Sequence, residues 1–266
     1  MIMEDNIMRT NFHTHTYRCK HAGGTEQDYV LAAINQEVSI LGFSDHAPYP
    51  DDRFGLRMDF CELEEHLSIV HNLQKEYALH LTIYCGLEIE YDPREHHYYE
   101  ELLSSYGCDY LLLGQHFYID KNYQAHNIYD ITDSSQYIDY AYSLVDGMKS
   151  GYFKVLAHPD VIFINNLPWD ENAEKACDII IATAKEYHII LEFNANGIRR
   201  GETTFVDGVR YPYPHKCFWD KVATLKLPVI VNSDCHGPEQ IWDNIMDKAH
   251  LITKDWKLNV IESILT

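Results

Sequence analysis

Short apolar runs alternate with longer amphipathic segments along this chain, and this alternation is the feature that most constrains its fold. The apolar runs have the length of strands and cover residues 7–15, 39–46, 81–90, 109–117, 153–160, 189–195 and 228–234. The segments between them have helical patterning and cover residues 25–36, 61–77, 97–106, 134–149, 171–187 and 215–225, with another from residue 238 onward. This order predicts parallel strands joined by right-handed helical crossovers.

The length of the chain is compatible with one curled sheet. A chain of 266 residues fits a closed or nearly closed α/β barrel of about seven strand–helix units. No low-complexity segment, charge block or linker-like run divides it, so we expect a single domain over residues 1–266. An open, doubly wound sheet is the alternative, but no glycine-rich phosphate loop follows the first run.

Charge and hydropathy argue against two classes of partner. The formal net charge is −20, which opposes binding to nucleic acid or to an anionic membrane surface. Bound divalent cations would cancel part of this charge. No run approaches the roughly 18 apolar residues that a membrane span needs. We therefore expect no nucleic-acid and no membrane partner, and nothing in the sequence sets the oligomeric state.

Cysteine usage and the N-terminal residues predict a cytoplasmic protein. The seven cysteines are widely spaced and form no C-x-x-C motif, which argues against a disulfide framework and for a reducing compartment. The first nine residues include Glu4 and Asp5 and lack the apolar core of a secretory signal.

The 16 histidines are the compositional fact that most needs an explanation. His13 and His15 lie two positions apart in a strand-like run, so their side chains project to the same side. Six of the seven runs carry a histidine or a carboxylate at or just after their C-terminal end. These candidate ligands are His13, His15, His21, His46, Glu88, His116, His158, Asp234 and His236.

In an α/β barrel, the C-terminal ends of the strands meet at one face. Nine nitrogen and oxygen ligands at that face are too many for one metal ion and suit two or three divalent ions such as Zn, Mn or Fe. Each residue alone could instead be an ordinary hydrogen-bonded residue at the rim. We interpret the remaining histidines as surface residues: His66, His71, His80, His96, His97, His126, His188, His215 and His250.

Six short motifs, in order, resemble the polymerase-and-histidinol-phosphatase (PHP) family over essentially the whole chain. They are His-Thr-His, Ser-Asp-His, Gly-Leu-Glu, Gly-Gln-His, Ala-His-Pro and Asn-Ser-Asp-Cys-His. The resemblance implies a distorted (β/α)7 barrel, similar to a TIM barrel, with the active site at the C-terminal ends of the strands. It also implies a centre of three divalent metal ions at that face.

The resemblance further implies how the ligands are shared among the ions. One ion is expected on His13, His15, Glu88 and Asp234. A second is expected on Glu88, His116 and His158, with Glu88 bridging the two. The third is expected on His21, His46 and His236.

Within the family, the chain is most similar to the monofunctional histidinol-phosphatases. Arg53 and Arg57 follow Ser-Asp-His-Ala-Pro, and residues 191–200 resemble the subfamily segment Glu-x-Asn-x-x-Gly-x-Arg. This similarity implies hydrolysis of L-histidinol phosphate to L-histidinol and phosphate in histidine biosynthesis. The chain departs from the subfamily at residues 159–165, where a basic residue is expected and no arginine occurs.

A phosphomonoesterase must neutralise charge as the ester bond breaks, and paired metal ions can activate water and hold phosphoryl oxygens. Glu88 is therefore our candidate for a catalytic bridge, and Arg199, Arg200 and Arg53 are our candidates for binding a small phosphorylated substrate. Asp45 either protonates the leaving alkoxide or orients a histidine ligand. Asp160 is a weaker candidate for the acid.

Two other functions are compatible with the same residues. The first is a phosphoesterase for another small phosphate ester, or a 3′-exonuclease-like activity, although the acidic composition opposes nucleic acid. The second is a metal-binding module without catalytic activity. The presence of all nine ligands argues against that second function.

Overall fold

The computed structural model describes residues 8–265, and its core is one curled sheet of eight parallel strands. The strands, in spatial order, are β1 (Thr10–Asn11), β2 (Ile40–His46), β3 (Thr82–Ile89), β4 (Tyr110–Leu113), β7 (Val155–Leu156), β8 (Ile190–Asn194), β11 (Pro228–Asn232) and β12 (Asn259–Val260). Residues 1–7, which carry most of the N-terminal segment in which we expected no signal, lie outside the described residues.

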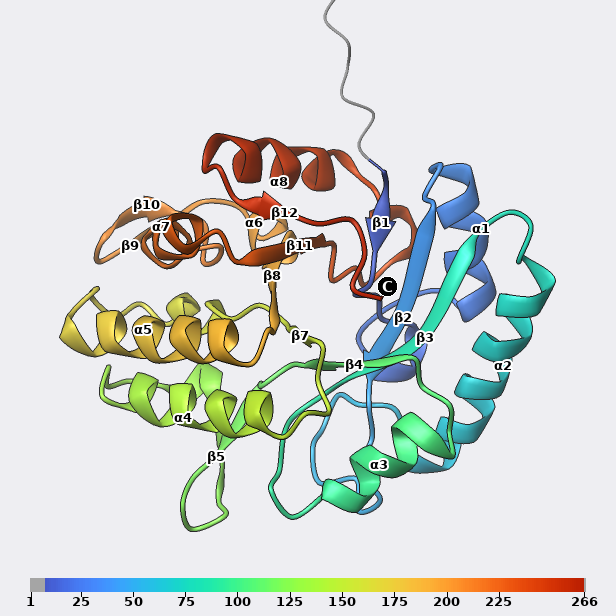
Figure 1. The fold of residues 1–266 in the computed structure, drawn as a ribbon, viewed down its shortest axis with the longest axis horizontal. Coiled ribbons are helices and arrows are strands. Elements are labelled where there is room, and N and C mark those ends of the chain that lie inside the picture. Colours follow the sequence, from blue (N-terminus) through green and yellow to red (C-terminus); the bar gives the residue numbers. More distant parts are fainter. Residues whose placement is uncertain (1–7, 266) are drawn as a thin grey trace, which may run out of the picture.

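The expected helices form an outer layer around the strands (Figure 1). They are α1 (Glu26–Asn35), α2 (Leu63–Glu76), α3 (His96–Ser104), α4 (Gln136–Lys149), α5 (Glu171–Glu186), α7 (Lys216–Leu225) and α8 (Asn244–Asp255). Thr25 caps α1 as a reciprocal pair with Asp28, in which each side chain accepts a hydrogen bond from the backbone N–H of the other residue. The parallel α/β architecture is therefore confirmed. Within residues 8–265, no helix combines the length and hydrophobicity needed to cross a bilayer.

The sheet curls until its first strand meets β11. Thr14 and Cys235, each three positions beyond the end of its strand, form a parallel bridge, and the His15 N–H donates to the Cys235 carbonyl at 3.0 Å. At the other end of β11, Pro228 pairs with Asn259 of β12. All seven expected strands are present, and β12 is an additional eighth strand. A strand of two residues is too short to show an alternating pattern. The sequence therefore did not reveal β12, which lies in the C-terminal segment that we expected to be helical.

Two strands are much shorter than the apolar runs that contain them. Just beyond each of β1 and β7, one backbone N–H donates to a side chain. The Phe12 N–H donates to Asn232 Oδ1 at 2.9 Å, and the His158 N–H donates to Glu192 Oε2 at 2.9 Å. These side-chain contacts end the regular pairing where the candidate ligands begin.

Two hairpins project from segments in which we expected no strands. One pairs β5 (Phe117–Ile119) with β6 (Ala125–Asn127), and the other pairs β9 (Thr203–Phe205) with β10 (Gly208–Arg210). The second hairpin belongs to the segment 201–214 that follows the short helix α6 (Asn196–Arg199). Short 3-10 helices complete the connections: η1 (Tyr17–Cys19), η2 (Phe60–Glu62), η3 (Ile128–Asp130), η4 (Val161–Ile164) and η5 (Pro238–Gln240).

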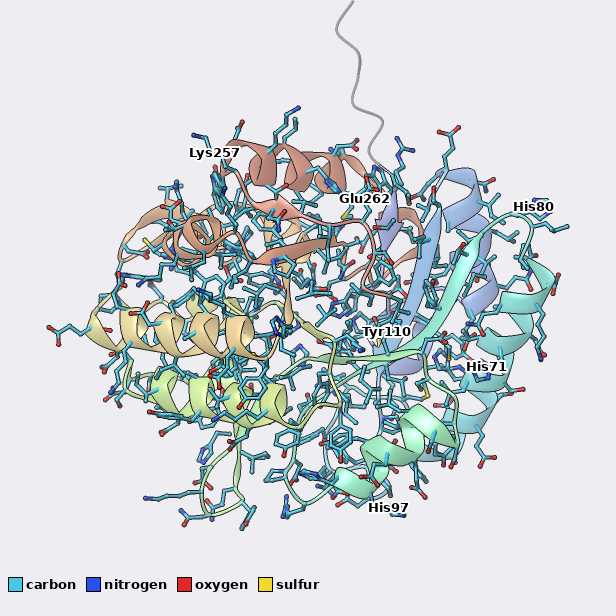
Figure 2. The ribbon with its side chains drawn as sticks, viewed as in Figure 1. His71, His80, His97, Tyr110, Lys257 and Glu262 are labelled. Atoms are coloured by element: carbon cyan, nitrogen blue, oxygen red, sulfur yellow. The ribbon has the colours of Figure 1, made fainter. Side chains whose placement is uncertain are left out.

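Tyr110 fills the interior of the curled sheet (Figure 2). Its hydroxyl lies 2.7 Å from the Phe12 carbonyl oxygen and 2.8 Å from the Phe43 carbonyl oxygen, so it links the first two strands. Gly86 makes room for the ring, because a Cβ atom there would lie 2.5 Å from it. The interior of the curled sheet is therefore a packed core.

The interpretation of nine histidines as surface residues was wrong for two of them. His71, His80 and His97 lie at the periphery, as expected (Figure 2). His66 is fully buried, with Nδ1 2.7 Å from Glu26 Oε1, and His215 is buried beside Asp207. The carboxylate that satisfies His66 lies 40 positions away in the sequence, so local patterning could not reveal the burial of His66.

Glu26 joins three elements through a buried ion cluster. Its Oε1 atom accepts hydrogen bonds from His66 Nδ1 and from Arg18 Nε, both at 2.7 Å. Burial by itself raises the pKa of Glu26, but the hydrogen bonds and charges of His66 and Arg18 lower it to about 2. The pKa in the folded state is thus below that of the unfolded chain.

We expect Glu26→Gln to lower the free energy of unfolding by about 2–3 kcal/mol at pH 7. The contribution of Glu26 is complete above pH 4.5 and is lost as the pH falls toward 2, so the two proteins should converge in acid. Urea unfolding at a series of pH values measures this difference. Glu64→Gln, at an exposed position of α2, is the control. Equal stability of the Glu26 variant and the wild type at pH 7 would contradict the assignment.

Candidate metal centre

The structure brings all nine candidate ligands together at the C-terminal ends of the strands. They come from six strand ends and from the turn after η1, as the sequence predicted. His158 and Asp234 have backbone φ angles of 28° and 48°, in the left-handed region that non-glycine residues rarely adopt. Such strained backbone conformations persist only where the surrounding structure holds them in place, and they are common at functional sites.

Glu88 lies at the centre of this group and is buried. Its Oε2 atom faces three nitrogens, at 3.2 Å (His13 Nε2), 3.5 Å (His15 Nε2) and 2.9 Å (His46 Nδ1). Its Oε1 atom faces two more, at 2.8 Å (His158 Nε2) and 3.8 Å (His116 Nε2). The two oxygens of one carboxylate therefore face two different sets of histidines.

Asp234 and two further histidines, His21 and His236, complete the group. Asp234 Oδ1 lies 3.0 Å from His15 Nε2 and 3.6 Å from His13 Nε2. On the outer side, His21 Nε2 lies 3.0 Å from His236 Nε2, and both rings are close to the ring of His46. The side chains of His21, His46 and His236 bring one nitrogen each to within 4.8 Å of one another.

The unsatisfied buried atoms of this group indicate what it can bind. His13 Nε2, His15 Nε2 and Glu88 Oε2 are buried and have no hydrogen-bond partner. Buried polar atoms normally have one, so these atoms point to a ligand. Imidazole nitrogens and carboxylate oxygens are the donors that zinc, manganese and iron prefer. The residues at this face therefore fit divalent metal ions.

Asp45 lies behind this group. Its Oδ2 atom accepts hydrogen bonds from the backbone N–H and the hydroxyl of Thr16, and its Oδ1 atom lies 3.7 Å from His15 Nδ1. Burial by itself raises the pKa of Asp45, but the nearby His15 ring and the hydrogen bond from the Thr16 hydroxyl lower it. A buried and ionised carboxylate is poorly suited to protonate a leaving group. The geometry therefore favours the orienting role over the acid.

Asp160, the weaker candidate for the acid, is also buried. Its Oδ2 atom accepts hydrogen bonds from the His215 N–H at 2.6 Å and from Trp219 Nε1 at 2.9 Å. These contacts fix the start of α7. We therefore interpret Asp160 as a structural residue.

A cavity of about 520 Å³ lies over the candidate ligands. Six of the nine ligands line it, and its walls include Tyr129 and Tyr213. Arg199 and Arg200 also line it, as expected of residues that bind substrate. Arg199 is held in place by Ser233 and Asp243, whereas Arg200 is exposed, with its guanidinium 6.0 Å from the Tyr213 ring.

The structure does not bring Arg53 to this cavity. Its guanidinium donates to Asp51, Asp92 and Glu95. Arg57, four positions later in the same loop, lines the cavity instead. It donates to Glu90 and lies 3.3 Å from His116 Nδ1. The sequence placed both arginines in the loop but gave no sign of which one faces inward.

Gly114 provides the space that Glu88 occupies. A Cβ atom at residue 114 would lie 2.0 Å from Glu88 Oε1, which is far inside contact distance. We expect Gly114→Ala to displace this carboxylate and to weaken the binding of divalent metal at least about 10-fold. Metal content after dialysis, measured by atomic emission spectroscopy, tests this.

Gly23→Ala is the matched control for this experiment. A Cβ atom at residue 23 would have no heavy atom within 4 Å, so this variant should retain the metal content of the wild type. Wild-type metal content in the Gly114 variant would show that Glu88 does not hold metal in this position.

Three comparisons with known proteins find relatives of this chain. A family model described as PHP domain matches residues 11–196. The protein of Deinococcus radiodurans named probable histidinol-phosphatase is 28% identical over 241 residues, which cover 86% of each chain. The histidinol-phosphatase of Bacillus subtilis is 25% identical over 258 residues, which cover 86% of this chain and 94% of that protein.

One solved structure shows the same fold. It is the histidinol phosphate phosphatase of Lactococcus lactis, in complex with zinc, L-histidinol and phosphate. The two structures superpose with a TM-score of 0.70 at 15% identity, over 96% of this chain and 95% of that one.

Proposed function

Because the chain belongs to the PHP family, we propose that it is a metal-dependent phosphomonoesterase that hydrolyses L-histidinol phosphate to L-histidinol and phosphate. One observation carries this proposal: Glu88 presents its two oxygens to two sets of histidines below a cavity that arginines line. The names of the two relatives support the substrate. The reaction would belong to histidine biosynthesis.

We propose three positions for divalent ions. The first position uses His13, His15, Glu88 and Asp234, the second uses Glu88, His116 and His158, and the third uses His21, His46 and His236. Ions bound there would act as Lewis acids that stabilise charge on the phosphoryl oxygens and make water more acidic. Zn, Mn and Fe all suit these ligands.

Two arginines of the cavity, Arg57 and Arg200, are proposed to bind the phosphate group. Arg200 is exposed at the cavity wall, and Arg57 approaches from the opposite loop, next to His116. A guanidinium binds phosphate through two parallel hydrogen bonds. Residues 161–164, which follow the candidate ligand His158, are apolar, so Arg57 is our candidate to replace the basic residue that is missing there. Arg199 would hold the backbone of Ser233 in position.

The substrate and the need for metal can be tested together. We expect the zinc-, manganese- or iron-loaded protein to release phosphate from L-histidinol phosphate faster than from a panel of other phosphate monoesters. Treatment with a chelator should abolish the release, and added metal should restore it. A preference for another ester would change the proposed substrate but leave the proposed reaction class unchanged. Metal-loaded protein that hydrolyses no ester would contradict the proposed enzyme.

The two arginine positions can be compared directly. We expect Arg200→Ala to raise KM by roughly 10- to 100-fold, because a charge-assisted hydrogen bond to phosphate contributes about 1.5–3 kcal/mol. Arg53→Ala, outside the cavity, should leave KM unchanged. Steady-state kinetics of the two variants measure this. An effect of Arg53→Ala larger than that of Arg200→Ala would show that the loop of Arg53 binds the substrate after all.

A further inference from the structure

β8 is the one strand among the seven expected ones that contributes no candidate ligand. Its carboxylate, Glu192, is fully buried behind the ligand group and does not line the cavity. A buried carboxylate needs several hydrogen bonds to offset the loss of its hydration. The partners of Glu192 therefore indicate what it does.

Each oxygen of Glu192 accepts two hydrogen bonds. Oε1 lies 2.7 Å from His13 Nδ1 and 2.8 Å from Asn232 Nδ2. Oε2 lies 2.9 Å from the backbone nitrogen of His158 and 2.8 Å from Asn194 Nδ2. The amide NH₂ groups and the backbone N–H can only donate hydrogen bonds, so Glu192 accepts a hydrogen bond from each of them.

The contact with His13 sets the tautomer of that ring. Because Glu192 accepts from Nδ1, the proton of the neutral imidazole lies on Nδ1 and the lone pair lies on Nε2. His13 Nε2 is the buried atom without a partner, and it faces Glu88 at 3.2 Å and Asp234 at 3.6 Å. Glu192 thus presents the ligating nitrogen of His13 to the proposed first ion.

The contact with His158 acts on the backbone. His158 has a φ angle of 28°, and its N–H donates to Glu192 Oε2. In this conformation its Nε2 atom reaches Glu88 Oε1 at 2.8 Å, on the side of the proposed second ion. One carboxylate therefore holds ligands on both sides of Glu88.

We propose that Glu192 is a positioning residue that sets the tautomer of His13 and the backbone of His158, and so couples the first two ion positions without touching metal or substrate. This inference rests on the proposed metal centre. It does not depend on which phosphate ester the enzyme hydrolyses.

Glu192→Gln tests this role. The amide has only one acceptor oxygen, and its NH₂ group would meet donors. We expect metal affinity, measured by competition with a chromophoric chelator, to fall about 10- to 100-fold. In the zinc-loaded proteins, ¹⁵N NMR of the His13 ring should show a protonated Nδ1 and an unprotonated Nε2 in the wild type, and a loss of this pattern in the variant.

Two further variants separate positioning from general stability. Glu26→Gln also neutralises a buried carboxylate, but its partners are Arg18 and His66, so it should lose stability and keep wild-type metal affinity. Glu192→Asp keeps the charge but is shorter by one methylene, so it cannot reach both histidines, and we expect it to bind metal more weakly than the wild type even if Glu192→Gln does not fold.

Wild-type metal affinity together with an unchanged His13 tautomer in a folded Glu192 variant would overturn the inference. Neither measurement uses a phosphate ester. A different substrate preference of the wild type would therefore correct the proposed function and leave this inference standing.

Discussion

The rest of the structure depends on one buried carboxylate, Glu88, that faces the nitrogens of five histidines. An ionised carboxylate loses several kcal/mol of hydration when it is buried, and partners of opposite charge must offset that loss. The surrounding histidines can do so only in part, because several of their nitrogens have no hydrogen-bond partner. Divalent ions between these nitrogens and the carboxylates would satisfy both. We therefore regard metal binding as part of the energetics of the fold as well as of the chemistry.

The curled parallel sheet makes this arrangement possible because the C-terminal ends of all its strands lie at one face. Regular pairing includes the ligands His46 and Glu88 in β2 and β3, whereas β1 and β7 stop after two residues each. There, the side-chain oxygens of Asn232 and Glu192 accept hydrogen bonds from the backbone N–H groups of Phe12 and His158. The same side chains that end the strands thus hold the ligands, which explains why strained φ angles persist at this face.

The sequence predicted the parallel α/β fold and the convergence of nine ligands, because strand ends are marked by apolar runs and ligands by residue type. It could not reveal contacts that only the folded chain creates. Arg53 and Arg57 look alike in sequence, yet only Arg57 faces the cavity. The burial of His66 depends on Glu26, forty positions away. The sequence did not predict the role of Glu192, because a single carboxylate in a strand forms no pattern. Nothing local therefore distinguishes a carboxylate that orients a ligand from one that does not.

The most direct test of the central role of Glu88 is anomalous diffraction from crystals of the manganese- or zinc-loaded protein with inorganic phosphate. The account predicts anomalous peaks on both sides of Glu88, one against His13 and His15 and one against His116 and His158, and a third peak among His21, His46 and His236. Phosphate should lie between these ions and Arg200. A single ion that leaves one oxygen of Glu88 without metal, or ions bound elsewhere on the protein, would contradict the account.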